Sequence, residues 1–271
     1  MSTVKRAYFA LTKIRAESRS ETFILRIATT ASLVRKIRNK HFPKWSHRSI
    51  TATVQFHDVE FSYFVPKGYD FDIYLNPYFH EYEITSFVVT HLREGDAFVD
   101  IGAHAGAYTL LSSKKVQAKG KVISFEPNPL NLTYLSKNIK LNHIENATII
   151  PLAASKEKGT CQLHYSESDT ALSSTVFNKY NREKTIEVEK TTVDEVCQSL
   201  GIEQVKIIKI DTEGCDFQVL QGALNTLKGT QYVIIEHSEK CIKELLLSLN
   251  YALTYLEPSG YLLATKKGLF S

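Results

Sequence analysis

The sequence contains no closely spaced pair of cysteines. Its four cysteines stand at positions 161, 197, 215 and 241, too far apart for any Cys-x-x-Cys motif. Zinc ribbons and dithiol redox sites need such pairs, so the sequence excludes both classes of site. Isolated cysteines are typical of a reducing compartment, where they serve as small apolar residues. We therefore expect a cytoplasmic protein.

Long apolar runs are missing as well. Basic residues interrupt the N-terminal segment before an apolar stretch of signal-peptide length develops, namely Lys5, Arg6, Lys13 and Arg15. Nowhere does the chain approach the roughly 20 apolar residues that a membrane-spanning helix needs. These two absences predict a soluble protein without a secretory signal.

Positive charge is concentrated at the N-terminus. Residues 1–50 contain 12 Lys or Arg but only 2 Asp or Glu, whereas the whole chain has a formal net charge of +4, so residues 51–271 carry −6. The basic arm, rather than the body, is therefore the candidate for binding an anionic partner. No interleaved aromatic and basic pattern indicates nucleic acid, and we expect none to bind.

Residues 22–38 place several apolar side chains close to helical spacing, with arginines largely on the other side. This pattern predicts an amphipathic helix. The helix could lie on an anionic membrane surface, or it could pack its apolar stripe on the body or on a second subunit. Both interpretations stay open, and so does the oligomeric state.

Two changes of pattern divide the chain. Residues 51–65 alternate as expected for β-structure, and a Pro-Lys-Gly turn follows them. Residues 78–92 return to a helical pattern, ahead of a regular core that begins after Gly95. We therefore predict a basic N-terminal extension of helices and a short β segment, residues 1–77, and an α/β domain, residues 78–271.

The core alternates strands with helices. The predicted strands are 97–101, 121–125, 147–152, 205–210 and 232–235, and the predicted helices are 106–115, 129–141, 192–200, 217–227 and 242–249. Such alternation is typical of a parallel sheet with helices on both faces. Two final strands, 251–256 and 261–264, are joined by a tight turn and must be antiparallel. We predict a doubly wound, mostly parallel seven-stranded α/β sheet with an antiparallel last strand and an inserted hairpin within 159–190.

The strongest local motif is the run Phe-Val-Asp-Ile-Gly-Ala-His-Ala-Gly at residues 98–106. An apolar strand meets a glycine-containing turn that opens a helix, and ligands bind at such strand ends. Gly102 permits close approach to a ligand, and Gly106 permits close packing of helix and strand. Because His104 stands two residues after Gly102, the dinucleotide fingerprint Gly-x-Gly-x-x-Gly is absent, as is the Lys-Ser/Thr of a phosphate loop. Asp100 favours a cationic, amine-bearing ligand such as S-adenosyl-methionine over a pyrophosphate.

A second acidic residue, Glu126, ends the next predicted strand, 24 residues after Gly102. It is placed to accept hydrogen bonds from both hydroxyls of a ribose. This position indicates a nucleoside ligand without choosing between S-adenosyl-methionine and a nicotinamide cofactor. Asn128 and Pro129 have a structural explanation, since they are typical of an N-cap and the first residue of a helix.

Charged residues also cluster where the apolar strand 205–210 stops, in the run Lys-Ile-Asp-Thr-Glu-Gly. Unpaired charges are costly at a buried strand end. Asp211 would reach the crevice beside the ligand, or it would merely pair with Lys209 on the same side of the strand. Glu213 is either functional or a favourable charge at the start of the next helix. His237, after the next strand, is either a base or structural.

Together these motifs resemble the FkbM family of methyltransferases. The resemblance covers about residues 80–240 and rests on Tyr82-Glu83, Val99-Asp100-Ile101-Gly102-Ala103-His104-x-Gly106, Phe125-Glu126-Pro127-Asn128-Pro129, Leu152-Ala153-Ala154-Ser155, Thr191-Thr192-Val193-Asp194, Lys209-Ile210-Asp211-Thr212-Glu213-Gly214 and Ile235-Glu236-His237. Two positions depart from the family, which usually has Asn at the position of His104 and Val at that of Thr212. Both departures leave the carboxylates in place. The first 75 residues carry no resemblance.

The resemblance implies a class I, Rossmann-like fold and transfer of a methyl group from S-adenosyl-methionine to a hydroxyl on a sugar, glycan or secondary metabolite. It also implies a set of cofactor-binding residues. Glu83, Asp100 and the turn formed by Gly102, His104 and Gly106 would hold the methionine end of the cofactor. Glu126 would hold the ribose, Pro127 and Ala154 would border the adenine, and Asp211 would complete the site.

An alcohol must lose its proton around the transition state of methyl transfer. Candidates for the base are Glu213, His237 and Lys209, in that order, beside Asp211. A divalent ion held by Asp211, Glu213 and His237 could instead lower the pKa of the alcohol, although no ligand spacing compels a metal.

Two other functions stay open. One is a non-catalytic Rossmann-like module that docks to a membrane or partner through the basic N-terminal arm. The other is a nicotinamide-dependent reductase. It is the weaker alternative, because the third glycine of the dinucleotide fingerprint is missing. We expect the acceptor pocket to be built by residues 159–190 and the N-terminal region, whose sequence does not identify the acceptor.

Overall fold

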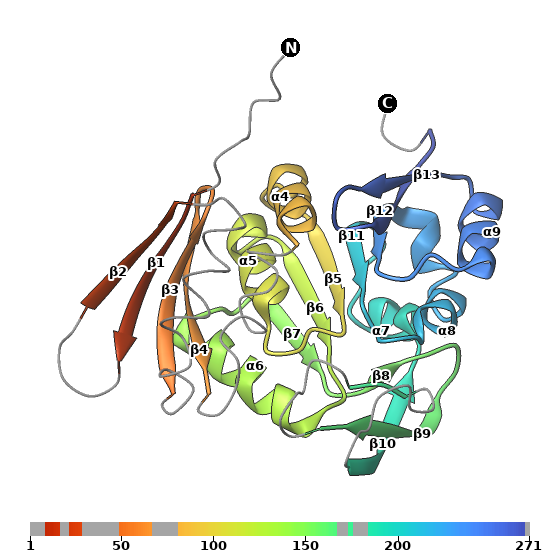
Figure 1. The fold of residues 1–271 in the computed structure, drawn as a ribbon. Coiled ribbons are helices and arrows are strands. Elements are labelled where there is room, and N and C mark those ends of the chain that lie inside the picture. Colours follow the sequence, from red (N-terminus) through yellow and green to blue (C-terminus); the bar gives the residue numbers. More distant parts are fainter. Residues whose placement is uncertain are drawn as a thin grey trace.

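A computed structural model of the chain describes residues 9–16, 22–28, 49–66, 81–166, 173–175 and 184–268. Its centre is one seven-stranded sheet in the order β13-β14-β12-β11-β5-β6-β7 (Figure 1). The strands are β5 (Ala97–Ile101), β6 (Lys121–Phe125), β7 (Ala147–Ile150), β11 (Val205–Ile210), β12 (Thr230–Ile235), β13 (Tyr251–Leu256) and β14 (Tyr261–Lys266). Strand β14 pairs antiparallel with both neighbours, and the other pairs are parallel. The predicted doubly wound sheet with an antiparallel last strand is confirmed.

Helices cover both faces of this sheet. They are α4 (Tyr82–His91), α5 (Ala107–Val116), α6 (Pro129–Leu141), α7 (Val193–Ser199), α8 (Asp216–Gln221) and α9 (Lys240–Ser248), with a 3₁₀ turn at Thr226–Gly229. Successive residues of a strand point to opposite faces. Accordingly, Phe98 of β5 belongs to the apolar core under α4 and α5, and its neighbour Val99 belongs to the core under α7, α8 and α9. The apolar strands are therefore buried on both sides.

The N-terminal part forms a second, antiparallel sheet in the strand order β2-β1-β3-β4. Its strands are β1 (Phe9–Ala16), β2 (Thr22–Ala28), β3 (Ile50–Phe56) and β4 (Val59–Val65). The predicted helix over 22–38 is therefore wrong for residues 22–28, and residues 29–38 lie outside the described part. Segment 22–28 is rich in Thr, Phe and Ile, which favour strands, and β1 supplies backbone partners from Phe9 to Arg15. The helical periodicity depended on apolar residues beyond Ala28.

The N-terminal sheet is held against α6 through its edge strand. The amide of Asn138 accepts a hydrogen bond from Phe64 N at 2.7 Å, and Asn142 accepts from Ser62 N at 2.7 Å while donating to Ser62 O at 2.6 Å. An exposed edge strand presents unpaired backbone groups, and these side chains satisfy them. The predicted domain boundary after residue 77 falls in 67–80, outside the described residues, and stays a prediction.

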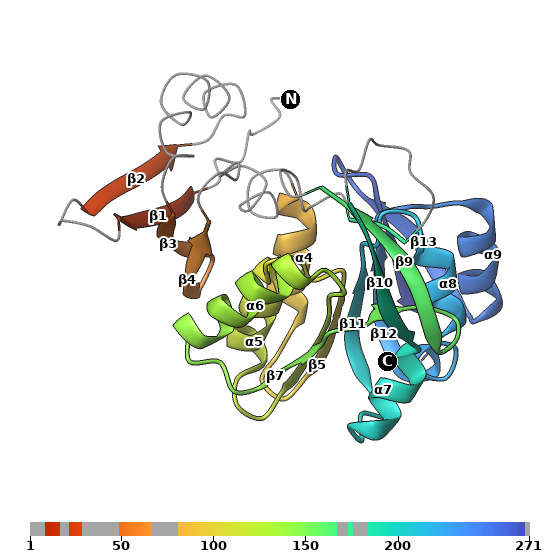
Figure 2. The same cartoon turned by 90° about the horizontal axis from the view of Figure 1, so that it is seen from below.

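The predicted insertion contains an antiparallel hairpin, β9 (Gly159–Tyr165) and β10 (Lys184–Thr191). A two-residue strand, β8 (Ala153–Ala154), joins it by parallel pairing with β10. Figure 2 views the molecule from the side of this hairpin. Among the described residues, no helix combines the length and apolar character needed to cross a bilayer.

Candidate active site

Four neighbouring parallel strands bring polar residues to one edge of the sheet. In the strand order β6, β5, β11, β12, the residues that follow the strands are Glu126, Gly102, Asp211 and Glu236. A cleft lies at this edge. The predicted residues that line it are Gly102, His104, Glu126, Pro127, Ala154, Asp211 and Glu213. The structure thus brings together residues that the sequence separates by more than a hundred positions.

Gly102 is required where the loops after β5 and β11 meet. Its φ is +80°, and a Cβ atom placed on it would lie 1.9 Å from the carbonyl oxygen of Asp211. Gly106 has a φ of +92°, and its Cβ would lie 2.5 Å from Cδ1 of Leu135 on α6. The sequence predicted the need for both glycines. The structure gives other reasons, a contact between two loops and a contact between two helices.

Glu126 is buried and held by local donors. Its Oε2 accepts a hydrogen bond from His104 N at 2.7 Å, and its Oε1 accepts from Asn128 N at 2.9 Å and from Asn131 Nδ2 at 3.3 Å. Burial raises the pKa of this carboxyl to about 7, although the three donors oppose the rise. Oε1 already accepts two hydrogen bonds and Oε2 only one, so Oε2 can still accept a hydrogen bond from a hydroxyl of a ligand in the cleft.

His104 has a left-handed backbone, with a φ of +50°, and lies at the wall of the cleft. Burial lowers the pKa of its imidazole to about 4, with the negative charge of Asp211 opposing and the positive charge of Lys209 adding to the shift. His104 is therefore neutral near pH 7. Its backbone N–H, rather than a charge, is its contribution to the Glu126 side of the cleft.

Asp100 lies behind the cleft wall. Its Oδ2 accepts a hydrogen bond from Thr109 Oγ1 at 2.7 Å, and Oδ1 has no hydrogen-bond partner in the described part of the chain. The side chain is 1% exposed, and burial raises its pKa, with Lys209 opposing the shift. A direct contact between Asp100 and a ligand therefore stays a prediction, whereas its pairing with the charge of Lys209 is part of the fold.

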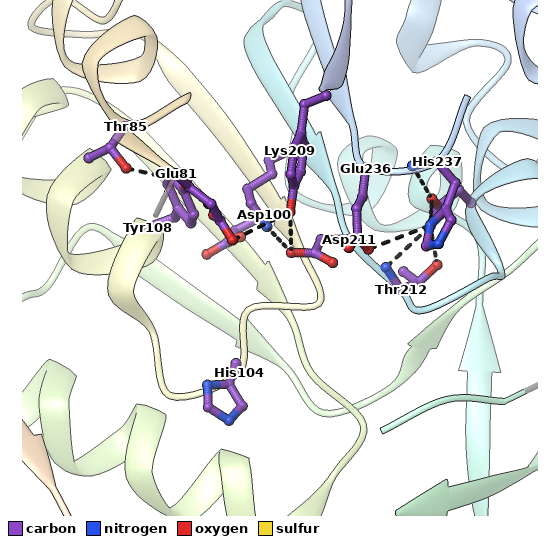
Figure 3. A network of polar contacts seen from close by, with 12 residues as sticks. Glu81, Thr85, Asp100, His104, Tyr108, Lys209, Asp211, Thr212, Glu236 and His237 are labelled. Atoms are coloured by element: carbon purple, nitrogen blue, oxygen red, sulfur yellow. Dashed lines mark hydrogen bonds and ion pairs between the residues drawn. The ribbon is translucent and has the colours of Figure 1, made fainter. Parts of the chain in front are cut away.

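Lys209 is the centre of a buried charge network (Figure 3). The side chain is 2% exposed, and Nζ donates to Asp211 Oδ2 at 2.8 Å and lies 4.7 Å from the ring centroid of Tyr108. Burial opposes its charge, but the carboxylates of Asp211, Glu81 and Asp100 outweigh burial and raise the pKa of Lys209. Lys209 is therefore protonated at neutral pH, which disfavours it as a base.

Glu81 also joins this network. Tyr108 OH donates to Glu81 Oε2 at 2.8 Å, and Tyr261 OH donates to Oε1 at 3.5 Å. Burial raises the pKa of Glu81, with the charge of Lys209 opposing. Glu83, two residues further on, lies in the first turn of α4 and is not among the described residues that line the cleft. Spacing within the sequence gave no signal for choosing Glu81.

Asp211 and Glu236 share a proton. Burial opposes ionisation of Asp211, but Lys209 and a hydrogen bond from Glu236 outweigh it and lower the pKa of Asp211. Burial, the charge of Asp211 and the same hydrogen bond raise the pKa of Glu236 to about 9. Asp211 is thus ionised and Glu236 protonated near pH 7. Glu236 belongs to a strand-end motif visible in the sequence, although it was not among the predicted site residues.

His237 is oriented by a buried carboxylate. Its Nδ1 lies 3.0 Å from Oδ2 of Asp216, and its backbone N donates to the same oxygen at 3.3 Å. Asp216 is 1% exposed, and its Oδ1 accepts from Thr212 Oγ1 at 2.5 Å and from Thr212 N at 3.2 Å. A proton on Nδ1 leaves Nε2 of His237 as an acceptor. Thr212 therefore fixes Asp216, and Asp216 fixes His237.

Three carboxylates approach one another closely at this end of the cleft. Oxygen atoms of Asp211, Glu213 and Glu236 lie within 4.8 Å of one another, and all three residues are half-buried. This group differs from the predicted metal set, which had His237 in place of Glu236. A metal here would compete with Lys209 for Asp211 and with the shared proton for Glu236.

The insertion closes one side of the cleft. Ser173, Ser174 and Thr175 line it. Ser174 Oγ donates to Glu213 O at 2.8 Å, and Asn128 Nδ2 donates to Ser173 Oγ at 2.8 Å. The expectation that residues 159–190 help to build the pocket is in line with these contacts.

A family model described as the methyltransferase FkbM domain matches residues 100–255, which is more than half of the chain. The hexuronic acid methyltransferase AglP of Haloferax volcanii is 26% identical over 156 residues, or 58% of this chain and 62% of that protein. The 2-O-methyltransferase NoeI of Sinorhizobium fredii is 25% identical over 192 residues, covering 65% and 77% of the two chains. The match to the first of these relatives thus spans about six tenths of its length.

Among solved structures, the methyltransferase FkbM of Methylobacillus flagellatus KT aligns with 67% of this chain and 50% of its own chain, with a TM-score of 0.45 and 15% sequence identity. The match of the family model spans the four strand ends that form the cleft. The chain therefore belongs to the FkbM methyltransferase domain family.

Proposed function

We propose that this chain transfers a methyl group from S-adenosyl-methionine to a hydroxyl oxygen, and that the acceptor is a sugar. The observation that carries the proposal is that carboxyl groups follow three of four adjacent strands, β6, β11 and β12. Glu126 stands at one side of the four strands, and Asp211 with Glu236 at the other. Such an arrangement suits a nucleoside that bears both a ribose and a cationic centre. The names of two relatives, a hexuronic acid methyltransferase and a 2-O-methyltransferase, support a sugar or similar acceptor.

The described residues fit S-adenosyl-methionine by charge. Lys209 is the one lysine or arginine among the residues labelled in Figure 3, which include Glu81, Asp100, Asp211 and Glu236. Oδ1 of Asp100 is buried without a hydrogen-bond partner in the described chain. An excess of buried carboxyl groups must be protonated or matched by positive charge. The amino group and sulfonium of the cofactor would supply that charge, and when bound the cofactor would supply an electrophilic methyl group.

Each wall of the cleft has a distinct role in this proposal. Glu126 would receive a ribose hydroxyl, with Pro127 and Ala154 beside the adenine. The turn after β5, with Gly102, His104 and Gly106, would hold the methionine end together with Asp211. This placement orders the ligand from the end of β6 to the end of β11. The acceptor hydroxyl would then approach from the ends of β11 and β12 for in-line attack.

Two side chains are suited to removing the hydroxyl proton. Glu213 lines the cleft beside Asp211, so geometry favours it as the base. His237 follows β12 and has its imidazole fixed by Asp216, so it is the second candidate. Asp211 is bound to Lys209 and Glu236, which favours a role in binding. Glu213→Gln and His237→Gln variants separate the two bases, because loss of the base lowers kcat and flattens the acidic limb of its pH profile.

Cofactor binding tests the proposal directly. Calorimetry should show saturable binding of S-adenosyl-methionine and of S-adenosyl-homocysteine by the whole chain. Glu126→Gln should weaken that binding roughly 10- to 100-fold, since a hydrogen bond to a charged group contributes about 1.5–3 kcal/mol. The matched control is Glu94→Gln, which alters an exposed carboxylate paired with Lys119 and should leave binding unchanged.

The same binding measurements distinguish the proposed methyltransferase from a reductase and from a non-catalytic module. Tighter binding of a nicotinamide cofactor than of S-adenosyl-methionine would favour a reductase and overturn the proposal. Cofactor binding without methyl transfer to any hydroxyl-bearing acceptor would favour a non-catalytic module that docks through residues 1–50. Peripheral membrane contact of that arm stays a prediction, which vesicle binding by the whole chain and by a chain starting after residue 50 would test.

A further inference from the structure

One buried side chain on α6 binds the N-terminal sheet on one side and the turn after β5 on the other. Asn138 is fully buried, with 0% of its surface exposed. Its Oδ1 accepts a hydrogen bond from Phe64 N at 2.7 Å, and its Nδ2 donates to Ala105 O at 2.8 Å. These two partners match the acceptor and the donor of a primary amide. Asn138 therefore links the backbone of β4 directly to the backbone of the turn.

Ala105 lies within the turn after β5, residues 102–106, and the inference rests on the function proposed above, in which this turn holds the methionine end of the cofactor. Among the described residues, Asn138 Nδ2 is the one hydrogen-bond donor to Ala105 O. A buried carbonyl group that loses its donor is costly, so this bond restrains the turn. The preceding residue, His104, donates its backbone N–H to Glu126 at 2.7 Å. The restraint on Ala105 thus acts beside the donor that holds the proposed ribose carboxylate.

Asn138 belongs to a buried row of side chains on α6. Asn131, Leu135 and Asn138 are spaced four and three residues apart, so they share one face of the helix. None of the three is more than 2% exposed. Asn131 donates to Glu126, and a Cβ atom placed on Gly106 would lie 2.5 Å from Leu135. One face of α6 therefore supports both Glu126 and the turn, and its last member also reaches β4.

The N-terminal sheet is packed firmly enough to restrain this side chain. Apolar residues of its strands, such as Phe61, belong to the same buried core as Phe98 of β5 and Leu110 of α5. Strand β4 lies beside α6 (Figure 1), where Lys137 Nζ is 3.2 Å from the ring centroid of Phe64. The match of the family model begins at residue 100, so this sheet lies outside the matched part of the chain.

We infer that the N-terminal sheet is part of the cofactor site, and that Asn138 is the positioning residue through which β4 holds the turn after β5 in its ligand-binding form. Coupling between two sites is reciprocal, so a bound cofactor must in turn strengthen the contact between Phe64 and Asn138. Asn142 provides an internal comparison. It binds the same strand, accepting from Ser62 N at 2.7 Å, but its amide donates to Ser62 O rather than to the turn.

Amide hydrogen exchange of the whole chain, resolved by NMR, tests this coupling without any substitution. The N–H of Phe64 should exchange at least tenfold more slowly when S-adenosyl-homocysteine saturates the chain. The N–H of Ser62, which is bonded to Asn142 on the same strand, should slow less. No slowing at Phe64, or equal slowing at both amides, would overturn the inference.

Three variants separate the two bonds of the amide by calorimetry. Asn138→Leu removes both bonds and should weaken S-adenosyl-homocysteine binding at least tenfold. Asn138→Asp keeps an acceptor for Phe64 but lacks the donor to Ala105, and it should weaken binding at least fivefold. The matched control, Asn142→Leu, loses two bonds to β4 and none to the turn, so binding should weaken less than threefold.

Unchanged binding in a folded Asn138 variant, or an equal loss in Asn142→Leu, would contradict the role given to Asn138. If neither Asn138 variant folds, hydrogen exchange in the unchanged chain decides. The two proposals fail in different ways. Cofactor binding without the expected coupling overturns this inference and leaves the proposed function in place, whereas absence of S-adenosyl-homocysteine binding by the unchanged chain overturns both.

Discussion

The two ends of the cleft hold their carboxylates in different ways. At the β6 end, Glu126 is fixed by backbone N–H groups of His104 and Asn128 and by the amide of Asn131. At the β11 end, Asp211 is fixed by Lys209 and by a proton shared with Glu236. The β6 end depends mainly on backbone donors, which side-chain replacement does not remove. The other depends on a balance of charges.

This difference determines how each end responds to change. Backbone donors carry no titratable group, so the surroundings of Glu126 stay constant while the carboxyl itself titrates. The β11 end contains several groups that titrate together, and a change in one alters the others. We therefore expect the β11 end to be the more sensitive to mutation and to pH.

The largest expected effect is at Lys209. Lys209→Met removes a buried cation bonded to Asp211 and leaves the carboxylates of the network without it, which should lower the free energy of unfolding by about 3–5 kcal/mol. Urea denaturation measures the loss, and it should shrink below pH 5 as the carboxylates become protonated. The control Lys240→Met removes a lysine that is 88% exposed and should change stability by less than about 0.5 kcal/mol. Equal stability of the two variants would show that the charge of Lys209 does not stabilise the β11 end of the cleft.

The next effect is at the junction of the two ends. Gly102→Ala adds a Cβ that would lie 1.9 Å from Asp211 O at a φ of +80°, so the loop after β5 must move. Gly201→Ala is a matched control, since Gly201 has a φ of +65° with nothing within 4 Å of its added Cβ. The control should lose about 1–2 kcal/mol of stability from backbone strain, and Gly102→Ala should lose more. Gly102→Ala should also weaken S-adenosyl-homocysteine binding more than tenfold, a loss that calorimetry would detect and that Gly201→Ala should not share.

A smaller effect concerns pH. The pKa of Glu236 is raised to about 9 from an ordinary value near 4.5, so the folded chain keeps a proton that the unfolded chain releases. Its stabilising contribution is full below pH 4.5 and is lost as pH rises through 9. Glu236→Gln should therefore lose about 2 kcal/mol less stability than the unchanged chain between pH 7 and 8.5, since each pH unit corresponds to about 1.36 kcal/mol. Parallel denaturation curves of both proteins, with Glu244→Gln as the surface control, would show equal losses if Glu236 were ionised at pH 7.

The smallest expected effect distinguishes two neighbouring glutamates. Glu83→Gln should change stability and cofactor binding by less than about 0.5 kcal/mol, because Glu83 is not among the described residues that line the cleft. Glu81→Gln should change both by more, since it alters a carboxyl bonded to Tyr108 at 2.8 Å. Thermal unfolding and calorimetry of the two variants measure the difference. A larger effect of Glu83→Gln would restore the assignment made from sequence.

The sequence was most informative where a site is built from neighbouring residues. The donors to Glu126 come from positions 104, 128 and 131, within or next to two recognisable motifs. The predicted N-cap is confirmed as well, since Asn128 Oδ1 accepts from Leu130 N at 2.9 Å. Strands 97–101, 121–125 and 205–210 have the predicted bounds because each is a short apolar run between turn signals.

The β11 end was predictable only in part. Tyr261 and Glu81 are 180 positions apart and meet through the folded sheet, so no local pattern connects them. The protonation of Glu236 depends on burial and on Asp211, and neither is visible in sequence. The helix predicted over 22–38 failed for a related reason. Strand β2 pairs with β1, and this pairing outweighs a helical periodicity that continued past the end of the strand.

Helix α6 connects the Glu126 end of the cleft with the N-terminal sheet. Asn131 in its first turn donates to Glu126, and Asn138 and Asn142 near its end bind the backbone of β4. A helix of 13 residues is about 20 Å long and moves as a stiff rod. A displacement of the N-terminal sheet would therefore move the amide of Asn131 that donates to Glu126. The position of the N-terminal sheet would in this way affect the carboxylate that is proposed to bind the cofactor.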